Sequence, residues 1–60
     1  MQRYFSNRLN DNKFDLSADD LYHITRVMRM KTGDCVEVVY NGDVYICELE
    51  IINNNINEKL

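Results

Sequence analysis

The sequence has 60 residues, a net charge of −3 at pH 7 and 45% hydrophobic residues, which limits it to one small domain with a modest core. Its first residues, MQRYFSNR, lack the apolar region of a signal peptide, and no apolar run is long enough to cross a membrane, so we expect a cytoplasmic protein. Two cysteines without a secretion signal fit a reducing compartment better than a disulfide framework.

The amino-terminal quarter of the chain predicts a strand followed by a loop. Residues 1–6 alternate weakly in polarity and carry two adjacent aromatic side chains, a pattern typical of a strand. The next stretch, NRLNDNKFD, is rich in Asn and Asp, which favour turns because their side chains bond to the nearby backbone. We expect Leu9 and Phe14 to fix this loop to the core.

A helix is predicted over residues 18–31. Ser17 can cap its first turn, Asp20 stands where the partner of a capping box belongs, and Leu16 and Leu21 occupy the positions of a hydrophobic staple. Gly33 is expected to end the helix in a left-handed conformation. Projection at 3.6 residues per turn separates two faces. The face expected to pack on the core holds Leu21, Ile24, Val27 and Met28. The opposite face holds Tyr22, Arg26 and Arg29, with His23 and Met30 at its flanks.

Residues 35–52 predict a β-hairpin that turns at Asn41-Gly42, the dipeptide that suits a type I′ turn. With a two-residue loop the expected cross-strand pairs are Tyr40 with Asp43, Val38 with Tyr45 and Val36 with Cys47. One face of the hairpin is then apolar, with Val36, Val38, Tyr45, Cys47 and Leu49. The other face is half solvated, with Glu37, Val39, Val44, Ile46 and Glu48. Cys35 and Cys47 fall on opposite faces, which argues against a disulfide between them.

The last eight residues, NNNINEKL, resemble a turn or linker because a run of asparagine cannot bury itself. The predicted fold is therefore mainly β with one helix, a small OB-like barrel over residues 1–52 that remains incomplete because the chain ends before a final strand. Such a chain could associate with a neighbour through its open sheet edge.

Charge is divided unevenly along the chain. Residues 1–31 hold six basic and four acidic side chains, a balance of +2, whereas residues 32–60 hold one basic and six acidic, a balance of −5. Arginine beside tyrosine suits unpaired RNA, because guanidinium groups bind phosphates and both side chains stack on bases. The candidate RNA-binding residues are Arg3, Tyr22, His23, Arg26, Arg29 and Lys31. A solvated face paired with hairpin carboxylates would explain the same arginines, and a hydrogen-bonded structural role explains His23 better than catalysis.

No catalytic, cofactor-binding or metal-binding residues are predicted. The single histidine rules out a cluster of histidine and cysteine ligands. Cys35 and Cys47 lie on apolar strands, where an inert thiol is commoner than a nucleophile. Gly33 and Gly42, the only glycines, are assigned to a helix cap and a turn, which leaves none for a phosphate loop.

The sequence resembles the amino-terminal domain of the bacterial 16S ribosomal RNA uridine-N3 methyltransferase family. The opening Arg3, Tyr4 and Phe5 match the family, and so does its pattern of His, three residues, Val-Leu-Arg, a basic step and Gly-Asp. That pattern is met by His23, Val27, Met28 in place of Leu, Arg29, Lys31, Gly33 and Asp34. The short turn at Asn41-Gly42 and the missing final strand depart from the family.

The resemblance implies a PUA-like barrel that positions 16S rRNA of the small ribosomal subunit for a separate, larger domain. In such proteins that domain binds S-adenosylmethionine, forms a homodimer and methylates N3 of a uridine. Residues 53–60 would then lead to this catalytic domain, and the chain itself would carry no catalytic site. The alternative is a structural module that packs against its own catalytic domain or a second subunit without touching RNA. Burial of the arginine face in the complete enzyme would favour this alternative.

Overall fold

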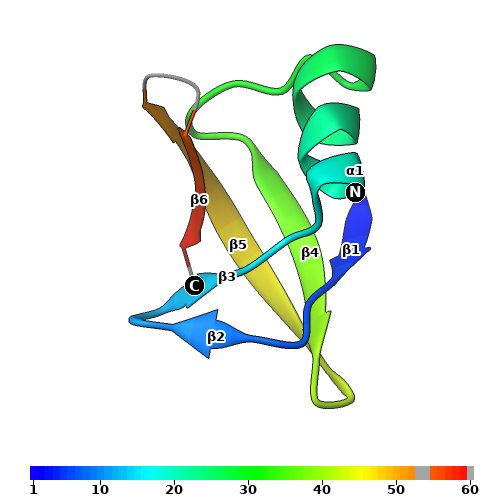
Figure 1. The fold of residues 1–60 in the computed structure, drawn as a ribbon, viewed down its shortest axis with the longest axis vertical. Coiled ribbons are helices and arrows are strands. Elements are labelled where there is room, and N and C mark those ends of the chain that lie inside the picture. The colour runs from blue at the N-terminus through cyan, green and yellow to red at the C-terminus, as the bar shows by residue number, and fades with distance from the viewer. Residues whose placement is uncertain (53–54, 60) are drawn as a thin grey trace.

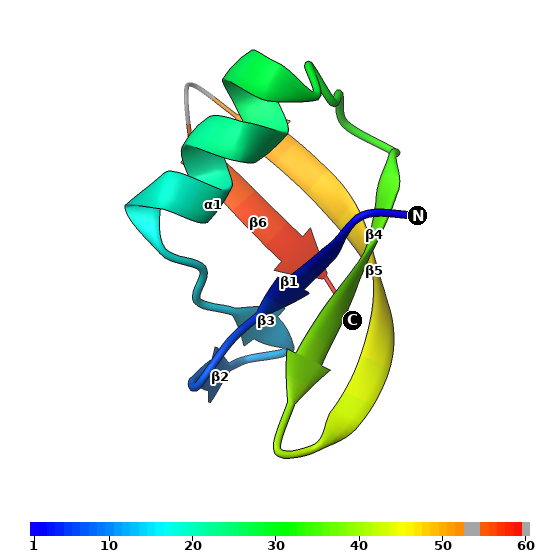
Figure 2. The ribbon, with the colours of Figure 1, turned by 90° about the vertical axis from the view of Figure 1, so that its right-hand side faces the viewer.

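The computed structural model describes residues 1–52 and 55–59, and the side chains of residues 1–51. These residues are mainly strands with one helical segment, as predicted (Figure 1). In chain order the elements are β1 (Arg3–Phe5), β2 (Leu9–Asn10), β3 (Lys13–Phe14), α1 (Ala18–Tyr22), the π-helix η1 (His23–Val27), β4 (Cys35–Tyr40), β5 (Asp43–Ile52) and β6 (Asn55–Lys59). Figure 2 shows α1 and η1 at one end of the curled sheet.

The sheet curls toward a barrel without closing over the described residues. Its strand order is β1-β4-β5-β6-β3-β2, so β1 and β2 are the two edge strands. β1 pairs with β4 in parallel, and the other neighbours are antiparallel. The segment between the edge strands is fixed by the Ser6 hydroxyl, which lies 2.6 Å from the Asp15 carbonyl oxygen and 2.9 Å from that of Arg8.

The β4–β5 hairpin confirms the predicted register. Tyr40 pairs with Asp43, Val38 with Tyr45 and Val36 with Cys47. The turn has positive φ at both central residues, 51° at Asn41 and 82° at Gly42, the combination that a type I′ turn requires. Cys35 is exposed and Cys47 buried, which confirms that they point to opposite faces.

The predicted loop over residues 7–15 contains a short hairpin that the sequence analysis missed. β2 and β3 pair through Leu9–Phe14 and Asn10–Lys13, and the two residues between them, Asp11 and Asn12, have φ of 49° and 63°. Asx side chains tolerate this left-handed conformation, so the same composition that suggested a loop also permits a tight turn. Phe14 is 2% exposed and Leu9 packs on the core, as expected.

The prediction of a turn or linker over residues 53–60 is wrong for Asn55–Lys59, which form β6. This strand pairs with β5 from Glu48 to Ile52, and Lys59 pairs with Lys13 of β3. The backbone N–H and C=O groups on the edge of β5 that faces away from β4 need a partner, and β6 supplies it. That demand outweighs the weak strand propensity of asparagine. Residues 53, 54 and 60 lie outside the described residues.

The start of the helix is as predicted. The Ser17 hydroxyl accepts a hydrogen bond from the Asp20 backbone N–H at 3.1 Å, and Asp19 and Asp20 lie in the first turn, where the helix dipole favours negative charge. Leu16 and Leu21 both pack against the core.

The end of the helix differs from the prediction. The Thr25 hydroxyl donates to the Leu21 carbonyl at 2.9 Å, which competes with the α-helical bond to that oxygen. The helix widens into a π-turn, in which the Met28 N–H donates to the His23 carbonyl at 2.8 Å. Arg29 then adopts φ of 51°, and the Met30 N–H closes the turn on the Ile24 carbonyl at 2.9 Å. Arg29, not Gly33, is therefore the left-handed residue that ends the helix.

This widening turns the helix surface away from the predicted faces. Ile24 is fully buried, as expected, but Val27 is 58% exposed and Met28 39% exposed, so neither belongs to the core. Met30 packs on the core instead. Gly33 has φ of 97° and lies in the turn before β4, where the Asp34 carboxylate accepts from the Lys31 N–H.

The core lies between the concave face of the sheet and η1. Its buried residues are Tyr4, Phe14, Ile24, Val36, Val38, Cys47 and Leu49. The predicted apolar face of the hairpin supplies four of them, and its fifth member, Tyr45, packs at the margin with its ring centroid 5.4 Å from that of Phe14.

Candidate nucleic-acid interface

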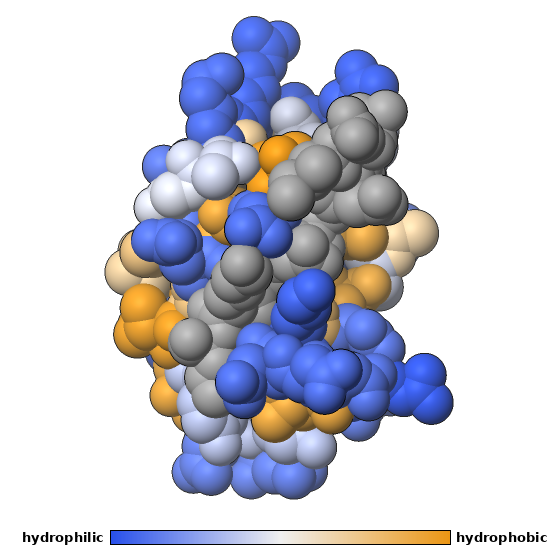
Figure 3. All heavy atoms as spheres, turned by 90° about the vertical axis from the view of Figure 1, so that its left-hand side faces the viewer, coloured by the Kyte–Doolittle hydropathy of each residue, from blue (hydrophilic) through white to orange (hydrophobic). Residues whose placement is uncertain are grey.

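The end of the helix and the loop after it present the predicted cationic side chains to solvent. Tyr22 is 63% exposed, and Arg26, Arg29 and Lys31 are exposed as well. We call these four residues the helix-end cluster. Figure 3 shows hydrophilic residues projecting from the end of the molecule at which η1 terminates. Tyr22 and Arg26 are one helical turn apart and share a side. Arg29 lies beyond the end of the helix, so the helical projection does not predict on which side of the molecule it lies.

The cations of the helix-end cluster have no carboxylate partners among the described side chains. The ion pairs found there join Arg3 to Glu37 and Arg8 to Asp15 instead. Pairing of Arg26 and Arg29 with hairpin carboxylates was an alternative to RNA binding, and no such ion pair is found among the side chains of residues 1–51. Arg26, in the last turn, is favoured by the helix dipole. The positive charge of this surface is thus available to an anion.

Arg3 belongs to a different surface from the helix-end cluster. Its Nε donates to Glu37 Oε1 at 3.1 Å, across the register that pairs the two residues on β1 and β4. Because side chains alternate along a strand, Arg3 points away from the face on which Tyr4 meets His23. A guanidinium that is already paired offers less to a phosphate, and Arg3 as an RNA contact stays a prediction.

His23 anchors the helix to β1. Its Nδ1 lies 2.8 Å from the Tyr4 hydroxyl, and the two rings meet edge to face with centroids 5.8 Å apart. Tyr4 is 5% exposed, because alternation on β1 directs its ring into the core, so Tyr4 is not available to stack on a base. Burial raises the pKa of the Tyr4 phenol above 10.0, and the Asp20 carboxylate raises that pKa further. The phenol therefore stays protonated near neutral pH, and its hydroxyl shares a hydrogen bond with His23 Nδ1.

Replacing Tyr4 with phenylalanine should lower the stability of the protein. It should also make that stability fall less steeply as pH rises in the alkaline range. The change leaves His23 Nδ1 without its partner, which costs about 0.5–1.5 kcal/mol at pH 7. In the wild type, stability is full below pH 10 and falls as pH rises from 10.0 through the raised pKa of Tyr4, because only the unfolded chain readily forms the phenolate. Urea denaturation at neutral and alkaline pH measures both effects. The exposed Tyr22→Phe variant is the control, and equal behaviour of the two variants would contradict the assignment.

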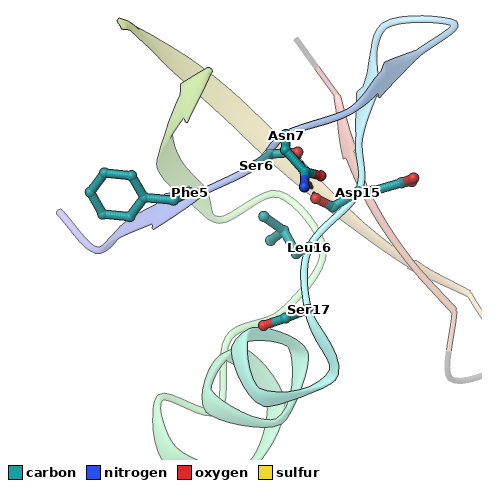
Figure 4. Close-up of a pocket in the computed structure, with 6 residues that line it drawn as sticks. All are labelled: Phe5, Ser6, Asn7, Asp15, Leu16 and Ser17. Carbon is teal, nitrogen blue, oxygen red and sulfur yellow. Dashed lines mark hydrogen bonds between the residues drawn. The ribbon is translucent and has the colours of Figure 1, made fainter. Parts of the chain in front are cut away.

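A hollow of about 450 Å³, not anticipated from the sequence, lies between the β1–β2 link and the start of α1 (Figure 4). It is lined by Phe5, Ser6, Asn7, Asp15, Leu16 and Ser17. The serine hydroxyl groups that line it already form hydrogen bonds within the fold. That of Ser6 lies within hydrogen-bond distance of two backbone carbonyl oxygens, and that of Ser17 caps the helix. Asp15 faces Arg8, with its carboxylate oxygen 3.8 Å from the guanidinium. The hollow therefore lacks a convergent set of groups for catalysis.

No helix within the described residues is long and apolar enough to cross a membrane. Over the same part of the chain, no group of three or more His, Cys, Asp and Glu side chains is arranged to hold a metal ion.

A small curled sheet that presents exposed arginines beside an exposed tyrosine is typical of RNA-binding β domains. Comparison with known families assigns this chain to one of them. The family model of the RNA methyltransferase PUA domain matches residues 16–56, which is more than half of the 60 residues, and the chain belongs to this family. The matched segment contains the whole helix-end cluster. No curated protein and no solved structure matches the chain.

Proposed function

We propose that this chain is the RNA-holding domain of an S-adenosylmethionine-dependent methyltransferase that modifies N3 of a uridine in 16S ribosomal RNA. The observation that carries the proposal is the set of unpaired, exposed cations at the helix end, inside the segment that matches the family. Membership in a family of RNA methyltransferase domains supports an RNA partner. The uridine, the ribosomal RNA and the homodimeric, cytoplasmic parent enzyme rest on the resemblance of the motif between His23 and Asp34.

The described residues do not fit S-adenosylmethionine. Gly33 lies in the turn before β4 and Gly42 in the hairpin turn, so neither can form a glycine-rich loop against a cofactor. We place the cofactor and the methyl transfer in another part of the parent enzyme. The role of this chain is then to bind RNA and fix its register, which needs positive charge and stacking surfaces and no reactive group.

The chemistry of the helix-end cluster favours unpaired RNA. Arginine and lysine bind phosphates of any sequence, whereas Tyr22 can stack on a base only where the base is not enclosed in a duplex. The exposed apolar side chains of Val27 and Met28 lie between the arginines and would also contact base faces. The surface thus offers both halves of a single-strand site, backbone contacts and base contacts.

Fluorescence anisotropy with a short unpaired RNA, and with a duplex of the same strand, tests the RNA part of the proposal. Three phosphate contacts should give a slope of log affinity against log salt of about −2, at about −0.7 per contact. Tighter binding of the unpaired RNA is expected. Binding that is independent of salt, or stronger for the duplex, would contradict the proposed surface.

The identity of the modified base is tested in cells. Methylation at N3 blocks the pairing edge of uridine, so it stops reverse transcription at that nucleotide. Loss of the gene that encodes this chain should remove one such stop from 16S ribosomal RNA, and restoring the gene should return it. An unchanged pattern of stops would reject the uridine-N3 assignment and leave the RNA-holding role to be judged from binding alone.

A further inference from the structure

The outer face of β1, β4 and β5 carries an apolar patch that the core does not use. Phe5 pairs with Val39, and Val39 pairs with Val44, so these three side chains form one row across the three strands. The next row joins Arg3, Glu37 and Ile46 in the same way. Because Tyr4, Val36, Val38 and Cys47 point into the core from these strands, both rows face outward.

We call these six residues the outer patch: Arg3, Phe5, Glu37, Val39, Val44 and Ile46. Three of its apolar members are open to solvent, with Phe5 69% exposed, Val44 48% and Ile46 54%, and Val39 between them is half-buried. One exposed apolar side chain is ordinary, but a contiguous group with charged residues beside it marks a contact surface. Strands β4 and β5 hold the patch on their paired backbones, so it needs no rearrangement to bind.

The charges of the outer patch match a second copy better than they match RNA. Arg3 and Glu37 give the patch one positive and one negative group, held 3.1 Å apart. The same patch on another molecule presents a carboxylate to each guanidinium and a guanidinium to each carboxylate, as a two-fold symmetric contact requires. A polyanion would instead meet Glu37 and, in the next row, Glu48 opposite Cys35. The carboxylates therefore make this face less suited to RNA than the helix-end cluster.

The dimensions of the molecule limit the area of such a contact. With extents of 27 × 20 Å, one face projects to roughly 540 Å², so contact over two whole faces would bury roughly 1,080 Å², the low end for specific interfaces. We propose that the outer patch pairs with the same patch of a second copy in a weak, reversible, symmetric dimer. This dimer is independent of the proposed function, because its face does not include the helix-end cluster.

Sedimentation equilibrium of the 60-residue chain over a range from micromolar to millimolar tests the proposal. The apparent mass should rise with concentration from 7.1 kDa toward twice that value. Ile46→Lys should weaken the dimer at least tenfold, because it replaces an exposed apolar side chain of the outer patch with a charged one, and should leave the fold intact because Ile46 is exposed. Val27→Lys is the matched control, since Val27 is as exposed but lies on η1, and it should dimerise like the wild type.

A charge exchange separates specific pairing from general stickiness. Arg3→Glu alone sets two carboxylates side by side on each copy and should weaken the dimer. Combining it with Glu37→Arg restores one charge of each sign and should recover most of the affinity. A mass of one chain at every concentration, or a dimer that Ile46→Lys leaves unchanged, would overturn the proposal. In the first case, loss of RNA affinity on Phe5→Ala would assign the patch to RNA, and unchanged affinity would assign it to a different protein.

Discussion

Replacing Leu49 with alanine is expected to remove most of the stability of the protein at 25 °C. Leu49 is fully buried at the centre of β5, among the largest buried side chains of the described core. Truncating a buried leucine costs about 2–5 kcal/mol, because the lost transfer free energy is joined by the cost of the cavity. A chain of this size has about 3–5 kcal/mol of stability to lose. The backbone of Leu49 also ties the Gly33-Asp34 turn to β5, so unfolding there would release the end of the helix loop.

Ile46→Ala provides the control for Leu49→Ala. Ile46 lies on the same strand but on its outer face, 54% exposed, so its truncation should change the free energy of unfolding by about 0.5 kcal/mol or less. Urea denaturation followed by far-ultraviolet circular dichroism, at a protein concentration low enough to exclude association, compares the two variants. Equal losses, or a loss below about 1 kcal/mol for Leu49→Ala, would mean that β5 does not form the centre of the core.

The second large effect is expected on RNA binding. Changing Arg26 and Arg29 together to alanine should weaken binding to unpaired RNA about 10- to 100-fold, if each guanidinium contributes about 0.7–1.4 kcal/mol through its phosphate contact. The slope of log affinity against log salt should become less steep by about 1.4, at about 0.7 for each contact removed. Alanine is preferable to glycine at position 29, because glycine would relieve the positive φ of Arg29 and change stability as well.

A matched variant separates local contact from net charge. Arg8→Ala with Lys13→Ala removes the same two positive charges from the β2–β3 hairpin, where both residues are exposed. Loss of the exposed Arg8–Asp15 pair should cost stability little. If the helix-end cluster binds RNA, this control keeps most of its affinity and its salt slope. Equal losses in the two double variants would show that only total charge matters and would remove the cluster as the site.

The features predicted correctly are those in which local chemistry decides the structure. Asn41-Gly42 suits a type I′ turn, and the turn fixes the register of every pair in β4 and β5. Ser17 satisfies a free N–H of the first helical turn, which places the start of α1. Both signals lie within a few residues of what they determine, so they need no knowledge of the rest of the fold.

The features that were missed depend on partners distant in the sequence. Tyr4 is buried because β1 joins β4, and its neighbour His23 comes from the helix, a meeting that periodicity alone does not predict. β6 forms because the edge of β5 that faces away from β4 needs a backbone partner. The early end of the helix depends on the Thr25 hydroxyl and the left-handed Arg29, and the latter is a conformation that sequence rules reserve for glycine or asparagine. The exposed cluster was therefore predicted by residue type, while its arrangement was not.

The strand order has a consequence for synthesis on the ribosome. β1 is made about thirty residues before its partner β4, and β3 meets β6, its neighbour on the side away from β2, only when residue 59 has been added. Before β4 and β6 are made, the strand pairing open to the amino-terminal half is that of β2 with β3. Nascent chains should therefore remain protease-sensitive until β6 has left the ribosome, since closing such distant contacts delays folding until both partners exist.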